Sequence, residues 1–152
     1  MNKFKIAGKV KKCEGSLTVP ENAGLRMVFS LVPDNGNYTS NTSVNLSKRW
    51  SKVKETYKLA YVNRFNFKLG NLLTTPVSSD IWVVQGIVFN KDNQLDLDAL
   101  NAVVKKLVAA AAYDQASVHV SQSTLDEAPD LLAMLEAQLL PHGYSVYVYP
   151  RV

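Results

Sequence analysis

Two groups of small polar residues in this sequence have the types and spacing to bind a ligand. One group lies in a polar, ten-residue loop, and its amide and glycine could contact a bound molecule closely. The other is a run of hydroxyls at the expected start of a helix, where the helix dipole favours anions. Each group follows a predicted strand, and open α/β sheets bind ligands where their strands end. The candidate ligand-binding residues are Asn35, Gly36, Ser121, Ser123 and Thr124.

Each group also has a simpler structural interpretation. An Asn-Gly pair forms tight turns because both residues tolerate positive φ, and serine or threonine side chains cap helices. The segment 121–127 contains no glycine. A phosphate cradle usually needs glycine so that backbone N–H groups can approach the ligand. We therefore expect any phosphate loop here to be altered.

The sequence contains no recognisable catalytic or metal-binding motif. It has no nucleophile elbow, Walker loop or G-x-G-x-x-G segment. Its two histidines and one cysteine lack the spacing of a zinc site. His119 lies between two valines of a predicted strand and is expected to be an interior histidine. We expect no catalytic residue, no metal and no cofactor.

A basic segment gives a different candidate, a nucleic-acid surface formed by Lys48, Arg49, Lys52 and Lys54. Residues 1–70 hold 13 basic and 4 acidic residues, whereas residues 71–152 hold 4 and 9. Such an asymmetry favours a basic patch that attracts phosphates. The alternative is a solvated helix face, with the neighbouring aromatic residues in the core.

The positions of these candidates depend on a predicted alternation of strands and helices. Period-two or continuous apolar runs predict six strands, at 3–12, 25–32, 65–67, 81–88, 116–120 and 144–149. Helical spacing predicts helices at about 42–59, 97–112 and 123–139, the second capped by Asp96 and the third opened by a Ser123-x-x-Asp126 capping box. This order predicts an α/β fold with a central mixed six-stranded sheet between two helical layers.

Length and composition predict one domain, residues 1–152, in a reducing compartment. The chain is long enough to bury about 70% of its unfolded surface. It has no apolar run of the ~20 residues that cross a bilayer, and its N-terminus lacks the apolar region of a signal peptide. One cysteine cannot form an internal disulfide. We expect a cytoplasmic protein, in the host cytoplasm if it is viral, without a membrane partner and free to form oligomers.

The order of these parts resembles the macro domain family, whose members bind ADP-ribose or related nucleotides and sometimes hydrolyse its esters. The resemblance covers nearly the whole chain and implies a three-layer α/β/α sandwich and a divergent, phage-like member. The segments that carry it are Pro33–Thr42, Ser47–Trp50, Tyr57 with Leu69-Gly70, Ile81–Gln85, Leu97–Ala112, Ser117–Val120 and Val146–Tyr149.

The sequence departs from the family at its ligand motifs. The adenine-contacting acid of the family corresponds to Ser16, and its "N-A-A-N" element keeps only Asn35 and Gly36. The glycine-rich diphosphate loop falls on 121–127, where Asp126 and Glu127 would repel a diphosphate by about 1 kcal/mol or more per close pair.

Three functions remain open at this point. The resemblance favours a degenerate, non-catalytic domain that binds a nucleotide, an ADP-ribose derivative or a macromolecular partner. The basic half favours a nucleic-acid-binding protein. The third alternative is an ADP-ribosyl hydrolase with atypical loops, in which Asn35 would position a water or a ribose hydroxyl.

Overall fold

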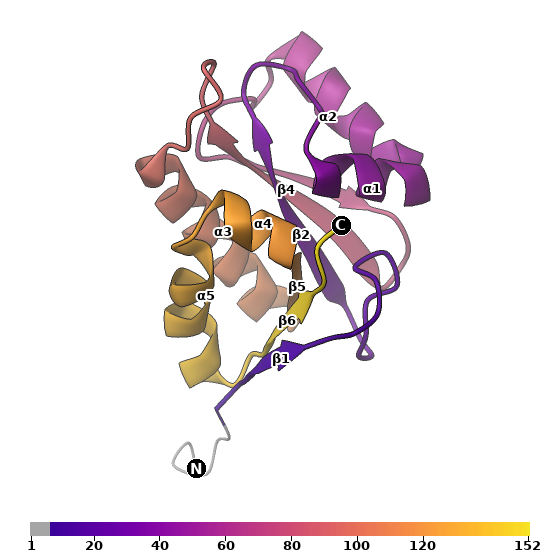
Figure 1. The fold of residues 1–152 in the computed structure, drawn as a ribbon, viewed down its shortest axis with the longest axis vertical. Helices are drawn as coiled ribbons and strands as arrows, with labels where there is room; N and C mark the ends of the chain where they lie inside the picture. Colours follow the sequence, from indigo (N-terminus) through magenta and orange to yellow (C-terminus); the bar gives the residue numbers. More distant parts are fainter. Residues whose placement is uncertain (1–6) are drawn as a thin grey trace.

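A computed structural model of the chain describes residues 7–152 and shows one sheet between two layers of helices (Figure 1). The strands are β1 (Val10–Lys12), β2 (Arg26–Pro33), β3 (Leu72–Pro76), β4 (Ile81–Phe89), β5 (Ser117–Ser121) and β6 (Val146–Tyr149). The helices are α1 (Asn41–Arg49), α2 (Ser51–Asn63), α3 (Leu97–Asp114), α4 (Gln122–Glu127) and α5 (Leu131–Leu139), followed by a 3₁₀ turn, η2 (Leu140–His142).

The strands lie in the order β1-β6-β5-β2-β4-β3. All neighbouring pairs are parallel except β3 and β4, which are antiparallel. β2 is central and buried on both faces, as its continuous apolar sequence predicts. The expected mixed six-stranded sheet in a three-layer α/β/α arrangement is therefore confirmed.

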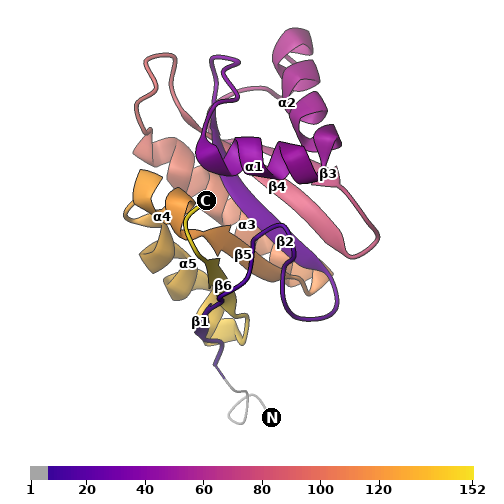
Figure 2. The same ribbon diagram turned by 45° about the vertical axis from the view of Figure 1, so that its right-hand side comes forward.

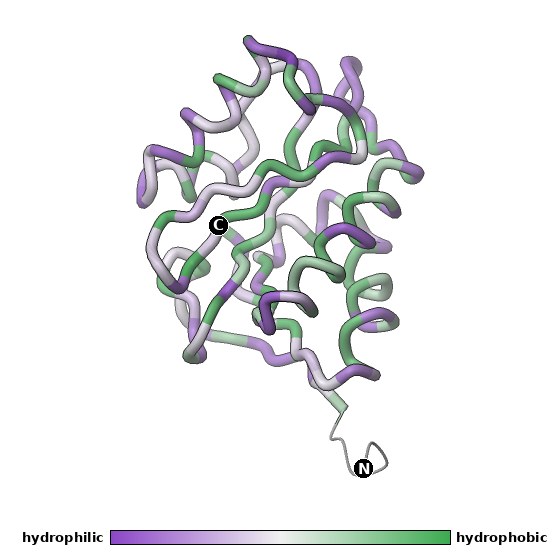
Figure 3. The backbone as a smooth tube through the Cα atoms, turned by 180° about the vertical axis from the view of Figure 1, so that it is seen from behind, coloured by the Kyte–Doolittle hydropathy of each residue, from purple (hydrophilic) through white to green (hydrophobic). Residues whose placement is uncertain are grey.

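Each face of the sheet has its own hydrophobic core. On one face, α3 and α5 cover Phe29 and Leu31. On the other, α1, α2 and the segment after β1 cover Val28 and Val32 (Figure 2). Seen from behind, green hydrophobic segments run through the strands and inner helix turns, while purple hydrophilic segments gather in the outer turns (Figure 3). Gly86 lets α3 approach β4, because a Cβ there would lie 2.5 Å from Val103.

The third strand was placed wrongly by the sequence pattern. Phe65 and Phe67 predicted a strand, but Arg64 and Asn66 on either side of Phe65 adopt positive φ, so this segment turns. The strand is instead β3, which was expected to begin a loop. It lies at the sheet edge, where a terminal Pro76 is tolerated because no N–H is needed. For the first strand, residues 3–6 lie outside the described residues and β1 covers only 10–12.

Two helices that were each expected to be continuous are broken. At Trp50 the backbone is extended, so α1 packs against β2 and α2 against β3. The second break separates α4 from α5, and Pro129 explains it because the residue before a proline avoids helical geometry. The cap also differs, since Ser121 rather than Ser123 caps α4 by accepting from the N–H of Thr124. Within residues 7–152 no helix has the length and apolar character to span a membrane.

Candidate functional site

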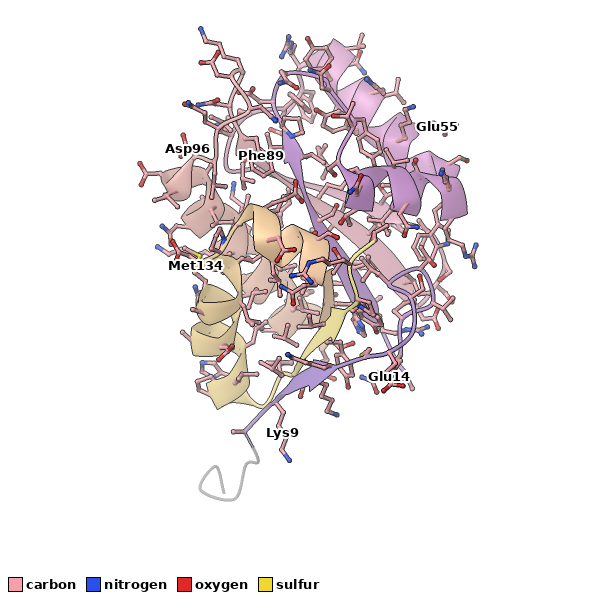
Figure 4. The ribbon with its side chains drawn as sticks, viewed as in Figure 1. Lys9, Glu14, Glu55, Phe89, Asp96 and Met134 are labelled. Carbon is pink, nitrogen blue, oxygen red and sulfur yellow. The ribbon has the colours of Figure 1, made fainter. Side chains whose placement is uncertain are left out.

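The carboxyl ends of three parallel strands meet at one edge of the sheet. β2 ends at Pro33 between β4 and β5, so the segments that follow these strands converge. The Asp34 N–H donates to the carbonyl of Phe89 at 2.9 Å, which ties the first two segments together. Phe89 is labelled at this edge in Figure 4. In open α/β sheets this edge is where ligands bind.

Two adjoining hollows open here, with volumes of about 270 and about 400 Å³. They share Thr39, Ser40 and Glu127 and together form what we call the strand-end cleft. The first hollow is also lined by Leu31, Pro33, Asn37, Phe89 and Asn93. The second is also lined by Asn41, Ser123, Asp126, Arg151 and Val152. Six of these thirteen residues carry a hydroxyl or an amide, three are charged and one is aromatic.

Three buried hydroxyls lie between the starts of α1 and α4. The Oγ1 of Thr42 lies 2.9 Å from the Oγ of Ser121, which lies 3.2 Å from the Oγ1 of Thr124. The third side, between the Thr124 and Thr42 oxygens, is 3.4 Å. All three side chains are buried. Each hydroxyl thus satisfies its neighbours, and we call the group the hydroxyl triad.

At the starts of α1 and α4, beside the triad, one backbone N–H is already hydrogen-bonded to a serine side chain. The Ser40 Oγ accepts from the N–H of Ser43 at 3.1 Å, and the Ser121 Oγ accepts from the N–H of Thr124 at 3.1 Å. These N–H groups belong to the donors that a helix start leaves unpaired. Because side chains already occupy them, they cannot bind a phosphate without rearrangement.

The acidic end of α4 is partly neutralised. Asp126 pairs with Arg151 at 2.6 Å, and its pKa is lowered by hydrogen bonds from Arg151 and then Gln122. The backbone N–H of Val152 donates to the Ser123 Oγ at 2.9 Å, so the last residues lie along α4. The repulsion expected from Asp126 is therefore weaker than the sequence alone indicates.

Glu127 is the carboxyl shared by both hollows. Burial and then the nearby charge of Asp126 raise the pKa of Glu127 to about 7. A carboxyl that titrates near neutral pH in a cleft is a marker of functional sites. Its charge at physiological pH is therefore intermediate, and it responds to small changes in its surroundings.

Solved structures with this arrangement of strands and helices include macrodomains. A macrodomain protein from Streptomyces coelicolor shares 22% identity, covers 94% of this chain and 99% of that chain, and superposes with a TM-score of 0.85. The macrodomain of Thermus aquaticus DarG shares 14% identity over 93% of this chain and 99% of its own, with a TM-score of 0.72. This chain has the macrodomain fold.

A third similar structure has a bound ligand. Thermosipho africanus DarTG in complex with ADP-ribose shares 10% identity, covers 84% of this chain and 38% of that chain, and has a TM-score of 0.66. No family model matches the sequence, and no match was found among curated proteins. The predicted resemblance to the macro domain family is thus confirmed by the fold.

Asn35 and Gly36 do not line the strand-end cleft, although Asn37 in the same loop does. The Asn35 Oδ1 accepts from the N–H of Asn37 at 3.0 Å, as in an Asx turn. Gly36 has a φ of +84° and packs against Tyr61, and its carbonyl accepts from the Lys58 Nζ at 2.6 Å. Neither residue lines the two hollows. In this structure both residues shape the loop, and a ligand contact remains a prediction.

The three predicted hydroxyl residues are brought together at the start of α4. Ser123 lines the second hollow, whereas Ser121 and Thr124 belong to the hydroxyl triad beneath it. That this segment is an altered phosphate loop stays a prediction. The basic residues Lys48, Arg49, Lys52 and Lys54 lie on α1 and α2, outside both hollows, and are exposed.

His119 does not line the cleft, and both of its ring nitrogens are hydrogen-bonded. Its Nε2 lies 2.7 Å from the Ser117 Oγ, its Nδ1 lies 2.7 Å from the Tyr149 hydroxyl, and its ring stacks on Tyr147. Burial and then the charge of Arg26 lower the pKa of His119 to about 3. In the described part of the chain, no cluster of three or more His, Cys, Asp or Glu side chains could hold a metal.

Sequence reasoning missed several residues that line the cleft, namely Asn37, Thr39, Ser40, Phe89, Asn93 and Glu127. Asn93 follows β4, and the same strand-end rule that selected the other two loops applies to it. Glu127 was noted for its charge, but its half-buried position and raised pKa depend on the packing of α4. No sequence pattern indicates that packing.

Proposed function

We propose that this macrodomain binds a nucleotide or an ADP-ribose derivative in the strand-end cleft and does not hydrolyse it. The observation that carries the proposal is the pair of hollows joined through Thr39, Ser40 and Glu127 at the carboxyl ends of β2, β4 and β5. Their volumes lie at the lower end of the range for small-molecule sites. The ADP-ribose present in the similar DarTG structure supports this ligand class.

The lining favours the sugar and base parts of such a ligand over its phosphates. Asn37, Thr39 and Asn93 offer amide and hydroxyl groups that pair with ribose hydroxyls, and Phe89 offers an aromatic surface. One backbone donor at each of the two helix starts, the N–H of Ser43 and that of Thr124, is held by Ser40 and Ser121 respectively. We therefore expect weaker phosphate recognition than a glycine-rich loop provides.

The absence of hydrolysis is proposed because the nearby hydroxyls have structural roles. Thr42, Ser121 and Thr124 bond one another in the interior. Asp126 is held by Arg151. Of the hydroxyls that line the cleft beside Glu127, that of Ser40 donates to the Ser43 Oγ and that of Ser123 accepts from the N–H of Val152.

Isothermal titration calorimetry with ADP-ribose, AMP and ribose 5-phosphate tests the proposal. We expect submillimolar affinity for ADP-ribose, and at least ten-fold weaker affinity in Thr39→Trp, which fills the shared wall of the cleft. Thr74→Trp, at an exposed position of the edge strand β3, is the matched control and should bind normally. Absence of heat with all three ligands at millimolar concentration, or equal weakening in the control, would exclude this site.

A second measurement addresses catalysis. The protein is incubated with an ADP-ribosylated peptide or oligonucleotide, and released ADP-ribose is separated and quantified. We expect no release above the buffer rate. Release of ADP-ribose in proportion to the protein concentration would replace the binding proposal with the hydrolase alternative.

A further inference from the structure

An exposed basic surface runs along α1, α2 and the turn that follows. It consists of Lys48, Arg49, Lys52, Lys54, Arg64 and Lys68, and we call it the basic helical face. The ion pairs of residues 7–152 involve the basic residues Arg26 and Arg151, so none of these six is paired. Residues 41–68 contain one acid, Glu55, which points outward from α2 (Figure 4). This face therefore has a strongly positive potential.

Two cations of the basic helical face lie where a helix disfavours positive charge. Lys52 and Lys54 lie in the first turn of α2, where the helix dipole disfavours cations. The first turn contains no acid, and no side chain caps it. Residues that reduce local stability without compensation are expected where function requires them. Lys48 and Arg49, at the end of α1, are by contrast favoured by the dipole there.

Aromatic rings lie next to the cations of this face. The Arg49 guanidinium lies 5.0 Å from the centre of the Trp50 ring, and that of Arg64 lies 4.3 Å from the Tyr61 ring. Phe65 is 77% exposed beside Arg64. Guanidinium planes and exposed aromatic rings are the surfaces on which unpaired bases stack.

We infer that the basic helical face binds single-stranded nucleic acid, with cations along the phosphates and bases stacked on Phe65 and the guanidinium groups. Lys48, Arg49, Lys52 and Lys54 lie near the start of α2, and Arg64 and Lys68 lie beyond its end. The 13 residues of α2 separate the two groups by about 20 Å, which corresponds to several nucleotides. The strand-end cleft has a separate lining, and none of the six cations contributes to it. The two surfaces therefore use different side chains.

Fluorescence anisotropy with a labelled 20-residue oligo-dT tests the inference. With four to six phosphates neutralised, the slope of log K against log salt should be about −3 to −4. Lys52→Gln/Lys54→Gln should make this slope shallower by about 1.4 and weaken binding about ten-fold at low salt. The control is Lys9→Gln/Lys105→Gln, which removes the same net charge from an exposed position before β1 and an exposed position on α3. It should leave the slope unchanged.

A second pair of variants tests the stacking contribution. Phe65→Ser should weaken oligo-dT binding about five-fold or more while the salt slope stays the same. Tyr113→Ser, which removes an 89% exposed ring from α3, is its control and should bind like the wild type. Melting curves of all variants establish that each is folded.

Several results would overturn the inference. These are no binding at low salt, affinity that does not depend on salt, or equal losses in the controls. Polyglutamate of the same length competing as well as oligo-dT would indicate an acidic protein partner instead. Duplex DNA binding as tightly as oligo-dT, with no effect of Phe65→Ser, would exclude base stacking. Calorimetry with ADP-ribose on the same variants measures whether they also affect the strand-end cleft, so that a loss of oligo-dT binding can be told apart from a loss of ligand binding.

Discussion

Thr42 and Ser121 are 79 positions apart in the sequence, yet their hydroxyl oxygens lie 2.9 Å apart in the interior. The contact joins the start of α1 to the end of β5, and Thr124 completes it from α4. Side-chain hydroxyls therefore hold the start of α1, the end of β5 and the start of α4 together.

The hydroxyl triad should contribute measurably to stability. Ser121→Ala removes both the cap of α4 and a buried hydrogen-bond partner, so we expect the free energy of unfolding to fall by about 2 kcal/mol. Urea unfolding followed by circular dichroism measures the change. Ser123→Ala is the control, because its half-buried hydroxyl accepts one exposed bond, and it should change stability by less than about 0.5 kcal/mol. Equal losses of stability in Ser121→Ala and Ser123→Ala would contradict the assignment of Ser121 as the stabilising cap of α4.

Glu127 should make ligand binding depend on pH. Its carboxyl is mostly neutral below its pKa of about 7 and charged above it. Binding of AMP or ADP-ribose should therefore weaken about five-fold as the pH rises from 6 to 8, which corresponds to about 1 kcal/mol of repulsion. Glu127→Gln should remove this dependence, and Glu136→Gln should not. Carbon NMR titration reads the carboxyl directly, and an ordinary pKa near 4.5 would contradict the burial argument.

His119 should make the fold sensitive to acid. The unfolded chain takes up a proton near pH 6.5, whereas the buried imidazole does so only near pH 3. Stability from this residue is complete above pH 6.5 and is lost as the pH falls, by about 2 kcal/mol between pH 7 and 5. Urea unfolding of wild type and His119→Gln at several pH values measures the difference. A constant difference across this range would show that His119 does not titrate as described.

Gly36 should be required by the fold regardless of any ligand. Its φ of +84° is unfavourable for other residues, and a Cβ would lie 2.8 Å from the Tyr61 ring. Gly36→Ala should cost about 1–3 kcal/mol of stability in thermal or urea unfolding. Gly15→Ala, where a Cβ meets nothing within 4 Å, should be nearly neutral. A stable Gly36→Ala protein that fails to bind ADP-ribose would instead support the predicted ligand contact of this loop.

The framework of this fold was predictable because its strongest signals are periodic. The apolar runs of β2 and β4 and the long amphipathic α3 with its Asp96 cap are local patterns that tertiary contacts reinforce. The edge strand β3 was missed because only two of its five residues are buried and its end, Thr74-Thr75-Pro76, is polar and stops at a proline. Pro129 indicated the break before α5, but the helical spacing of the leucines led to the prediction of one continuous helix.

The candidate site was less predictable because it depends on segments that are far apart in the chain. The strand-end rule found the first loop and the start of α4. It could not show that Thr42 would bond Ser121, or that Glu127 would be half buried between two hollows. Pairing of helix starts and the desolvation of a carboxyl are properties of packing, and no spacing of residue types encodes them.

The tether between the chain's last residues and α4 has a practical consequence for anyone preparing this protein. Arg151 and Val152 are anchored to Asp126 and Ser123 beside the second hollow. An affinity tag, fluorophore or neighbouring domain joined after Val152 would emerge at the mouth of the cavity and obstruct molecules entering it. Attachment ahead of β1, which starts at the opposite rim of the sheet, keeps that entrance clear.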